Sequence, residues 1–464
     1  MKMTELLIIS DDVVGEKMAG PGIRAWEISR SLARELGVVL AVPDYSPGDA
    51  GGLAGGAPFE VIRYSVARPS LLKEAAGRSR IILVQGYVLS KFPFLGRLNA
   101  HLVVDLYDPF VLENLFVHQG KGASRKDREL IHRHDLAVFN GLLAAGDHFL
   151  CASDRQRDLL MGALMSLNRI NPAALDFSAA ADDLVSVVPF GIREDEGDSR
   201  GERVIRGKAG AIGEGDIVFL WGGVISNWFD PLTLIGALAR ARREDPRLKL
   251  YFLSTRHPNP LTPGFEMARQ AMDAARKLGL AGESIVFNEE WVDYNRRAAY
   301  FREADIGVSI HKTHLETRYS FRTRMLDYLK HGLPILCTEG DFFADLVSRE
   351  SLGIAVGPEN PGELKDAMLR LAADDQLREG MKLRIAKART AFAWDTVTGP
   401  LIAHCRRVLS GRAAPRNRPS RKEIALVCAP RGPSALGTLG KKHGWFLFQR
   451  LPFSLAAKIR RILQ

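Results

Sequence analysis

Short, fully apolar runs recur along this chain, and longer segments with helical spacing separate them. Leu6–Ile9 is the first of these runs, and a Gly-Pro-Gly turn and a helical pattern over Ile23–Leu36 follow it. Further runs before residue 190 lie at Val38–Val42, Ile81–Val84, Leu102–Val104, Phe149–Cys151 and Val185–Val188. Apolar strands that alternate with helices are typical of parallel sheets covered by helices on both faces. This pattern predicts an α/β protein.

The same alternation restarts after a charged, glycine-rich stretch between Glu194 and Gly215. That stretch has no apolar periodicity, so we interpret it as an interdomain linker. Strands are expected beyond it at Ile217–Leu220, Leu250–Leu253, Ile285–Phe287, Ile306–Ser309 and Pro334–Cys337. Helices are expected over Pro231–Arg243, with Asp230 as N-cap, over Glu266–Leu278, and over Phe321–His331, which Gly332 ends. We therefore expect two parallel-sheet domains.

Composition excludes several other classes of protein. A length of 464 residues, with 46% hydrophobic and 25% charged residues, is ordinary for a globular protein of two domains. No apolar run approaches the ~18 residues that a membrane-spanning helix needs, and Leu6–Ile9 is too short for a signal-peptide core. The four cysteines form no CxxC pair and no metal-ligand spacing. We expect a cytoplasmic protein without a metal site.

The positive charge lies in the C-terminal tail. Residues 412–464 hold 12 of the 64 Lys and Arg and a single acid, so the tail carries +11 and the remaining chain −1. A nearly neutral body argues against nucleic acid as a partner. Residues 411–440 are interpreted as a mobile linker. Residues 441–464 mix apolar and basic side chains, which is typical of a segment lying on an anionic membrane surface; a cap folded onto the body is the alternative.

Two glycine turns lie where a predicted strand meets a predicted helix. Gly20 and Gly22 precede the first helix, and Arg24 follows in its first turn, where a cation opposes the helix dipole. Gly222 and Gly223 follow the first strand of the second half. Such turns let an anion approach the backbone at a helix N-terminus, so both are candidate phosphate sites. Plain turns or packing loops are the alternative.

Two arginines, Arg322 and Arg324, lie near the start of a later predicted helix, where they also oppose the dipole. One interpretation is a structural pair between Arg324 and Asp327, which share a helix face. The other is a diphosphate clamp, because guanidinium forks suit phosphate, with Glu316 and Asp327 holding ribose or sugar hydroxyls.

Two acids, Asp105 and Asp108, follow the predicted strand Leu102–Val104. Acids at the carboxyl end of a parallel strand face the crevice in which open α/β sheets bind ligands. Because it precedes Pro109, Asp108 also fits a turn. The chain contains no HExxH, GxSxG or Walker A sequence.

Taken in order, these pieces resemble the bacterial glycosyltransferases of family 4, which are retaining enzymes with the GT-B fold. The matching segments are GPGIRAWEISRSLA, LCASDRQRDLLMG, VVPFGI, GGVISNWFDPLTLIGAL, and ADIGVSI together with RTRMLDYLKHGLPILCTEGD. The resemblance implies two Rossmann-like domains that face a cleft. The implied divisions are an acceptor domain at 1–195, a linker at 196–212, a nucleotide-sugar donor domain at 213–392, a helix crossing back at 393–410 and a basic amphipathic tail at 411–464.

The resemblance also implies roles for the glycine turns and for the acids of the first domain. Gly20–Gly22 matches the family's N-terminal glycine loop. Gly222 and Gly223 match the family's donor-binding loop. The basic residue that is usual in this loop is missing here, and Asn227 is one of the residues found at that place, so we expect it to contact the donor. Asp105 or Asp108 stands where the family has a histidine.

The family's paired glutamates are only partly matched. In the family the two glutamates lie eight residues apart. The second matches Asp327, but the residue eight positions earlier is Tyr319, which is not an acid. We therefore expect Glu316 to take the place of the first. This departure shifts the expected phosphate contacts to Arg322 and Arg324. The catalytic residues that we expect are these two arginines together with Asp105 and Asp108.

The activity that the resemblance implies is a retaining, metal-independent transfer of a sugar from a nucleotide diphosphate sugar to a lipid-linked or oligosaccharide acceptor. It implies a role in cell-surface polysaccharide synthesis, on the inner face of the plasma membrane, without a cofactor besides the donor. The alternatives are a nucleotide-sugar epimerase of the same fold and a catalytically silent, membrane-bound scaffold that binds sugar nucleotides.

Overall fold

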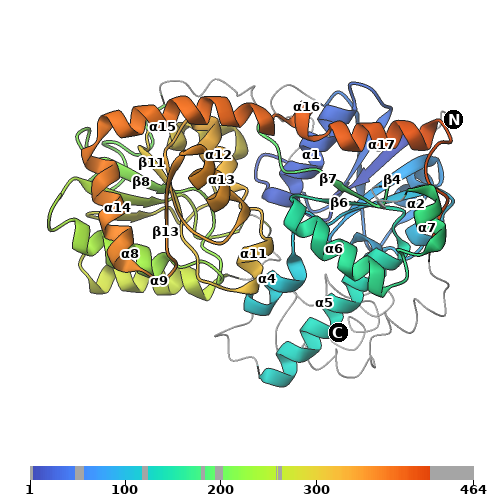
Figure 1. Ribbon diagram of the computed structural model, residues 1–464, viewed down its shortest axis with the longest axis horizontal. Coiled ribbons are helices and arrows are strands. Elements are labelled where there is room, and N and C mark those ends of the chain that lie inside the picture. Colours follow the sequence, from blue (N-terminus) through green and yellow to red (C-terminus); the bar gives the residue numbers. More distant parts are fainter. Residues whose placement is uncertain are drawn as a thin grey trace.

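Two parallel β-sheets, each covered by helices, form two domains that lie side by side (Figure 1). The computed structural model describes residues 4–46, 57–117, 124–178, 183–193, 202–257, 259 and 264–418. The first sheet has seven strands in the order β3-β2-β1-β4-β5-β6-β7, and the second has six in the order β10-β9-β8-β11-β12-β13. The predicted α/β architecture with two sheets is therefore confirmed.

The first domain follows the predicted alternation, with one strand that the sequence pattern did not reveal. Its elements are β1 (Thr4–Ile9), α1 (Gly20–Leu32), β2 (Val38–Pro43), β3 (Glu60–Tyr64), α2 (Ser70–Gly77), β4 (Ser79–Gln85), α3 (Val88–Lys91), β5 (His101–Asp105), α4 (Phe110–Val117), α5 (Arg125–Ala145), β6 (His148–Cys151), α6 (Asp154–Ser166), α7 (Pro172–Phe177) and β7 (Val185–Val187). The unpredicted strand, β3, lies at the sheet edge and is only partly buried, so its sequence is not a continuous apolar run.

The second domain contains the five predicted strands and adds a sixth at its edge. Its elements are β8 (Ile217–Trp221), α8 (Pro231–Ala241), β9 (Leu248–Phe252), α9 (Glu266–Lys277), β10 (Ile285–Phe287), α10 (Arg297–Arg302), β11 (Ile306–Ser309), α11 (Leu315–Tyr319), α12 (Arg324–His331), β12 (Ile335–Thr338), α13 (Phe342–Glu350), β13 (Gly353–Val356), α14 (Pro361–Ala373) and α15 (Asp375–Ala388). Helix α12 begins three residues later than expected, so Arg322 lies in the loop before it and Arg324 is its first residue.

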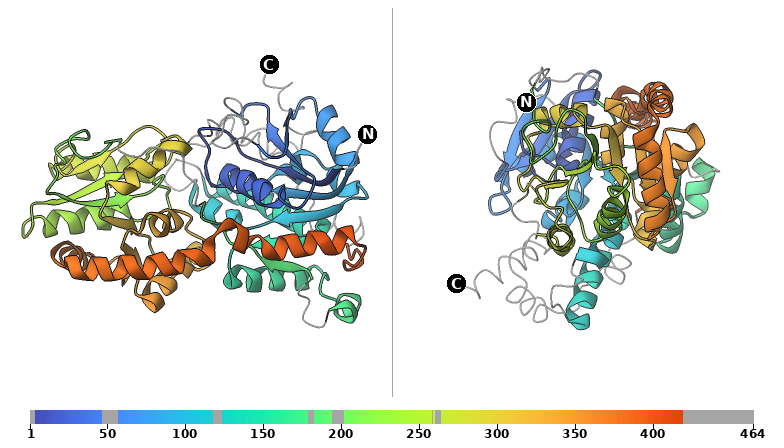
Figure 2. Two further views of the ribbon diagram at one scale, coloured as in Figure 1. Left: turned by 90° about the horizontal axis from the view of Figure 1, so that it is seen from above. Right: turned by 90° about the vertical axis from the view of Figure 1, so that its left-hand side faces the viewer.

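The chain returns to the first domain after α15. Helices α16 (Trp394–Val397) and α17 (Gly399–Leu409) lie on that domain, and Figure 2 shows this stretch in orange to red along both domains. The indole of Trp394 packs against the ring of Phe190, with centroids 5.1 Å apart. A Cβ atom on Gly191 would lie 2.5 Å from that indole, so this crossing requires glycine there. These two helices lie within residues 393–410, for which the resemblance implies a helix that crosses back.

The segment predicted as a linker at 196–212 is, where it is described, packed onto the second domain. Ile205 and Ile212 are buried in the core. The Glu303 carboxylate accepts hydrogen bonds from the backbone N–H groups of residues 204–206, and Arg206 pairs with Asp305 at 2.7 Å. Among the charged residues that suggested a linker, Arg206 instead takes part in this network.

The start of the basic tail is also docked onto the body, contrary to the mobile linker that we expected. Arg418 pairs with Asp147 and donates to the carbonyl oxygen of Gly96 at 3.0 Å, and Arg416 donates to the carbonyl oxygen of Asn99 at 2.7 Å. Residues 419–464, and with them the predicted membrane segment 441–464, lie outside the described residues. None of the helices that the structure describes is both long and apolar enough to cross a membrane.

Candidate active site

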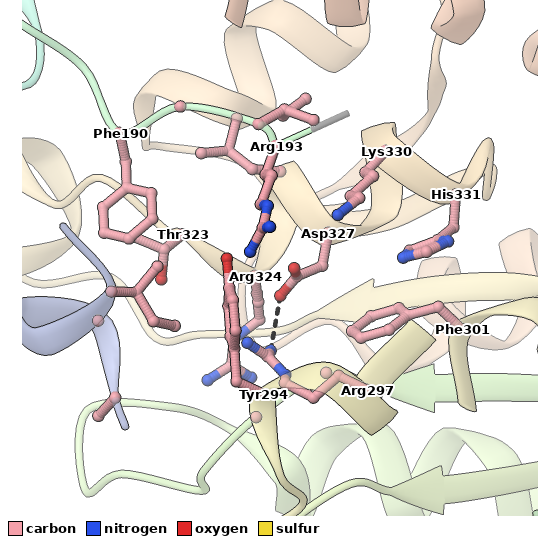
Figure 3. A pocket seen from close by; sticks show the side chains of 18 of the residues that line it. Phe190, Arg193, Tyr294, Arg297, Phe301, Thr323, Arg324, Asp327, Lys330 and His331 are labelled. Carbon is pink, nitrogen blue, oxygen red and sulfur yellow. Dashed lines mark hydrogen bonds and ion pairs between the residues drawn. The ribbon is translucent and has the colours of Figure 1, made fainter. Parts of the chain in front are cut away.

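A pocket of about 220 Å³ lies between the two domains and is lined by residues from both (Figure 3). The first domain contributes Gly20 and the segment Phe190–Arg193 after β7. The second domain contributes Gly222–Val224 after β8 and several residues of α12. Four of the predicted site residues, Gly20, Gly222, Gly223 and Arg324, are thus brought together with a fifth, Asp327.

Among the charged side chains that line this pocket, basic ones predominate. The pocket is lined by the basic side chains of Arg193, Arg297, Arg324 and Lys330. Asp327 is the one acidic residue among its described lining residues. Asp327 accepts a hydrogen bond of 2.6 Å from Arg297, as Figure 3 shows. An excess of fixed cations in a partly enclosed pocket attracts an anionic ligand. Arg193, Arg297 and Lys330 were missed at the sequence level, because they lie on separate segments without a shared motif.

The guanidinium of Arg324 is held by aromatic rings and retains an unused donor. Its centre lies 4.1 Å from the ring centroid of Phe229 and 4.7 Å from that of Trp221. One terminal nitrogen, Nη2, donates to the carbonyl oxygen of Val224 at 2.9 Å, whereas the buried Nη1 has no hydrogen-bond partner among the described residues. Burial lowers the pKa of Arg324 to about 10, so the side chain stays charged at neutral pH. The alternative pair of Arg324 with Asp327 is not formed.

The diglycine after β8 brings backbone to the pocket wall. A Cβ atom on Gly222 would lie 3.0 Å from the rings of Phe301 and Tyr328, and Gly223 has a φ of +148°, which other residues rarely adopt. The Tyr328 hydroxyl accepts a 2.8 Å hydrogen bond from the backbone N–H of Gly222. These constraints explain why glycine stands at both positions.

Asn227 does not line this pocket but connects the domains. Its side-chain amide donates to the carbonyl oxygens of Phe116 and Val117 of the first domain, both at 3.1 Å, and accepts from the N–H of Met267 at 3.1 Å. With both ends of its amide engaged, Asn227 fits a role in holding the domains together rather than the donor contact that we expected.

Arg322 and Glu316 pair with each other. Arg322 Nη1 and Nη2 lie 2.6 and 2.7 Å from the two carboxylate oxygens of Glu316, and the residues are only 5% and 0% exposed. Asp341 lies 3.6 Å from Arg322 Nε. The guanidinium of Arg322, which we expected to bind phosphate, therefore binds the carboxylate of Glu316, which we expected to bind a sugar. The turn between α11 and α12 brings the two side chains together.

Arg24 and Asp105 form a second buried pair. Arg24 donates to the two Asp105 carboxylate oxygens at 2.6 and 3.0 Å, and to the carbonyl oxygens of Val188 and Pro189 at 2.9 and 3.0 Å. Arg24 thus faces protein acceptors instead of the anion that we expected. Gly22 is needed for packing, because a Cβ atom there would lie 2.1 Å from the carbonyl oxygen of Val13.

Asp108 lies in a second cavity, also of about 220 Å³, on the first-domain side. A side-chain hydrogen bond joins it to Glu113 of α4, a residue that the sequence analysis did not select. Burial raises the pKa of Asp108 to about 6 and that of Glu113 well above its usual range. The signal was present in the sequence, since a helix that begins directly after Pro109 places residue 113 about one turn beyond Asp108.

This carboxyl pair predicts a pH dependence of stability. Because the pKa of Asp108 is raised from 3.8 to about 6, its protonated form stabilises the fold below pH 4, and this contribution is lost as pH rises through about 6. The double variant Asp108→Asn/Glu113→Gln should therefore lose less stability than the wild type between pH 4.5 and 7, as measured by urea unfolding. Parallel pH profiles of the two proteins would contradict this expectation.

Within the residues that the structure describes, no three or more His, Cys, Asp or Glu side chains gather in an arrangement that could hold a metal ion.

Comparison with known proteins finds likeness in structure alone. No protein-family model and no curated protein matches the chain. Among solved structures, HepE from Anabaena in complex with UDP and glucose matches with a TM-score of 0.60 at 14% identity, over 88% of this chain and 100% of that one. WaaG, a glycosyltransferase involved in lipopolysaccharide biosynthesis, matches with a TM-score of 0.58 at 16% identity over the same shares.

A third match is the α,α-trehalose 6-phosphate synthase from Burkholderia multivorans, with a TM-score of 0.61 at 13% identity over 90% of this chain and 100% of that one. At such identities the likeness defines the fold. The chain therefore has the fold of the GT-B glycosyltransferases, with its basic pocket between the two sheet domains.

Proposed function

We propose that this protein is a glycosyltransferase that transfers a sugar from a nucleotide diphosphate sugar to a lipid-linked or oligosaccharide acceptor, in the synthesis of a cell-surface polysaccharide. The main support is the basic interdomain pocket, in which the Gly222–Gly223 loop and the unused donor of Arg324 lie together. The match to HepE, whose structure holds UDP and glucose, adds to this support.

The chemical problem in such a transfer is the negative charge that grows on the leaving diphosphate. In our proposal, Arg324 and the N-terminus of α12 stabilise that charge, because Thr323 and Arg324 line the pocket where the helix begins. Arg297 and Lys330 add positive charge, and Asp327 holds donor hydroxyls. These fixed cations take the place of a metal ion. Retention of configuration at the sugar is the outcome that we propose from the family resemblance.

On the acceptor side, we assign the orienting role to Asp108 rather than to Asp105. Asp105 is saturated by Arg24, whereas Asp108 lines a cavity beside the basic pocket. A carboxylate there accepts the proton of an acceptor hydroxyl within hydrogen-bond reach. Contacts between the domains, such as those of Asn227, help to exclude the water that would otherwise hydrolyse the donor.

One incubation tests this function against its rivals. The full-length protein is mixed with radiolabelled nucleotide sugars and a membrane lipid extract, in the presence of EDTA. We expect label in the lipid or oligosaccharide fraction. An epimerised nucleotide sugar would instead indicate an epimerase, and donor binding without turnover would indicate a silent scaffold. Loss of transfer with EDTA alone would overturn metal independence.

We further propose that the protein is cytoplasmic and binds the inner face of the plasma membrane through residues 441–464, which contain six Lys and Arg. Each basic residue near an anionic surface contributes about 1 kcal/mol. We expect the full chain to sediment with anionic vesicles at low salt, and not with zwitterionic ones.

The matched control is a variant that ends at residue 440, because it keeps the contacts of Arg416 and Arg418 with the first domain. This variant should stay in the supernatant. Full-length protein that also stays in the supernatant would refute membrane binding.

A further inference from the structure

The cavity that contains Asp108 adjoins the basic pocket but is a separate space. Gly20 lines the basic pocket, and the next residue, Pro21, lines the cavity. His257 lines both. A ligand in each space would therefore meet the other near His257 and the start of α1. This is the arrangement that a group transfer between two bound molecules needs.

The two spaces have opposite charge. Five acids line the cavity: Asp11, Asp12, Asp105, Asp108 and Glu113. Among the described residues that line the cavity, Lys91 is the one with a positively charged side chain. Its Nζ lies 2.5 Å from Asp11 Oδ1. The His257 side chain is mainly neutral, because burial lowers its pKa. A phosphate or carboxylate in this cavity would therefore face carboxyl groups without a spare cation from these lining residues.

A buried acceptor of hydrogen bonds is left open on the cavity wall. Gln85 ends β4, is 3% exposed and lines the cavity. Its Nε2 lies 3.4 Å from Asp105 Oδ2, whereas its Oε1 has no partner among the described residues. Buried polar atoms are normally satisfied, so this oxygen points to a ligand that donates a hydrogen bond. A sugar hydroxyl is such a donor, and an ionised phosphate is not.

The remaining wall suits the carbon side of a sugar ring. The rings of Tyr87 and Phe110 meet edge to face, with centroids 5.3 Å apart, and both residues line the cavity. Glu113, whose pKa burial raises well above its usual range, keeps a proton to donate, whereas Asp108, with a pKa of about 6, is mainly ionised at neutral pH and accepts hydrogen bonds. Hydroxyl groups, which also donate and accept, match this wall.

We propose that the cavity binds the acceptor through a non-anionic, hydroxyl-rich sugar and discriminates against phosphorylated or carboxylated sugars. This inference rests on the proposed function, since it names the acceptor class of the same site. The cavity's acids, the open oxygen of Gln85 and the pairing of Lys91 with Asp11 all favour a hydroxyl-bearing ligand over an anion.

Saturation-transfer NMR on the full-length protein tests the proposal. The probes are methyl α-glucopyranoside, methyl glucosaminide, glucose 6-phosphate and glucuronate, each with saturating UDP so that anionic probes cannot enter the basic pocket. We expect the glucoside and the glucosaminide to bind at least tenfold more tightly than the two anions. Equal or tighter binding of glucose 6-phosphate, or no binding of the neutral glucoside, would overturn the proposal.

A pair of variants locates the binding. Gln85→Leu should weaken the neutral glucoside about tenfold and leave UDP affinity unchanged, whereas Gln376→Leu, at an exposed position of α15, should change neither. An unaltered affinity of a folded Gln85→Leu protein for the glucoside would place the sugar elsewhere and overturn the assignment. If Gln85→Leu does not fold, the relative affinities of the wild type for the neutral and anionic probes still test the proposal. Failure to bind UDP would count against the proposed function instead.

Discussion

Arg324→Ala is expected to lower kcat/KM for sugar transfer by about 30- to 1000-fold, equivalent to roughly 2–4 kcal/mol of transition-state stabilisation. The reason is that Arg324 sits at the start of α12 with one buried nitrogen unused, where it can meet charge developing on the diphosphate. Arg324→Lys keeps the charge but loses the planar fork, so we expect it to recover only part of the rate. Steady-state kinetics at several donor concentrations measures both effects.

The matched control for this substitution is Arg276→Ala, which removes an exposed arginine whose side chain pairs with Asp273 at 2.7 Å. Its kinetics should remain within about twofold of the wild type, since exposed pairs contribute little. If folded Arg324→Ala turns over normally, the phosphate role of Arg324 is wrong. A purely structural role would instead reduce the melting temperature and leave activity per folded molecule intact.

Asp105→Ala is expected to reduce the free energy of unfolding by about 3–5 kcal/mol, because it leaves the guanidinium of Arg24 buried without its carboxylate. Both side chains of this pair have no solvent exposure. Two backbone carbonyls would remain as partners of Arg24, but they carry no full charge. Urea unfolding followed by tryptophan fluorescence measures the loss.

Glu129→Ala on α5 is the control for this prediction, because its pair with Arg125 is exposed and its loss should cost less than about 1 kcal/mol. Asp105→Asn separates structure from chemistry. A stable but inactive Asp105→Asn protein would return Asp105 to the reaction and contradict its assignment to the buried pair. An unstable protein with normal activity per folded molecule agrees with the structure.

Local features of the sequence were sufficient to predict most strands and several helices. The apolar runs Ile285–Phe287 and Ile306–Ser309 are strands with those same limits, Asp230 caps α8 by accepting from the N–H of Thr233, and Gly332 ends α12 at a φ of +69°. The edge strand β13, like β3, escaped the prediction because its residues are mostly half-buried. A strand shows as a continuous apolar run only when the fold covers both of its faces.

The glycine turns belong to the same local class of signal. Gly222 and Gly223 stand where a strand ends, and their position on the pocket wall follows from the strand order of a parallel sheet. The direction of a charged side chain is different, because it depends on neighbours that are distant in the sequence. Arg193, Arg297 and Lys330 gave no local sign that they would share one pocket.

The sequence by itself therefore determined the two sheets, the approximate limits of several helices and the backbone turns at the cleft, since periodicity and capping act within a few residues. Only the tertiary structure decided which charges are available to a ligand. Arg24 and Asp105 lie 81 residues apart and neutralise each other, whereas Arg324, two residues after the paired Arg322, keeps an unused donor. Burial makes each unmatched charge costly, so the folded chain pairs the arginines it can reach with carboxylates. In the cleft, Arg324 Nη1 is left without a hydrogen-bond partner among the described residues.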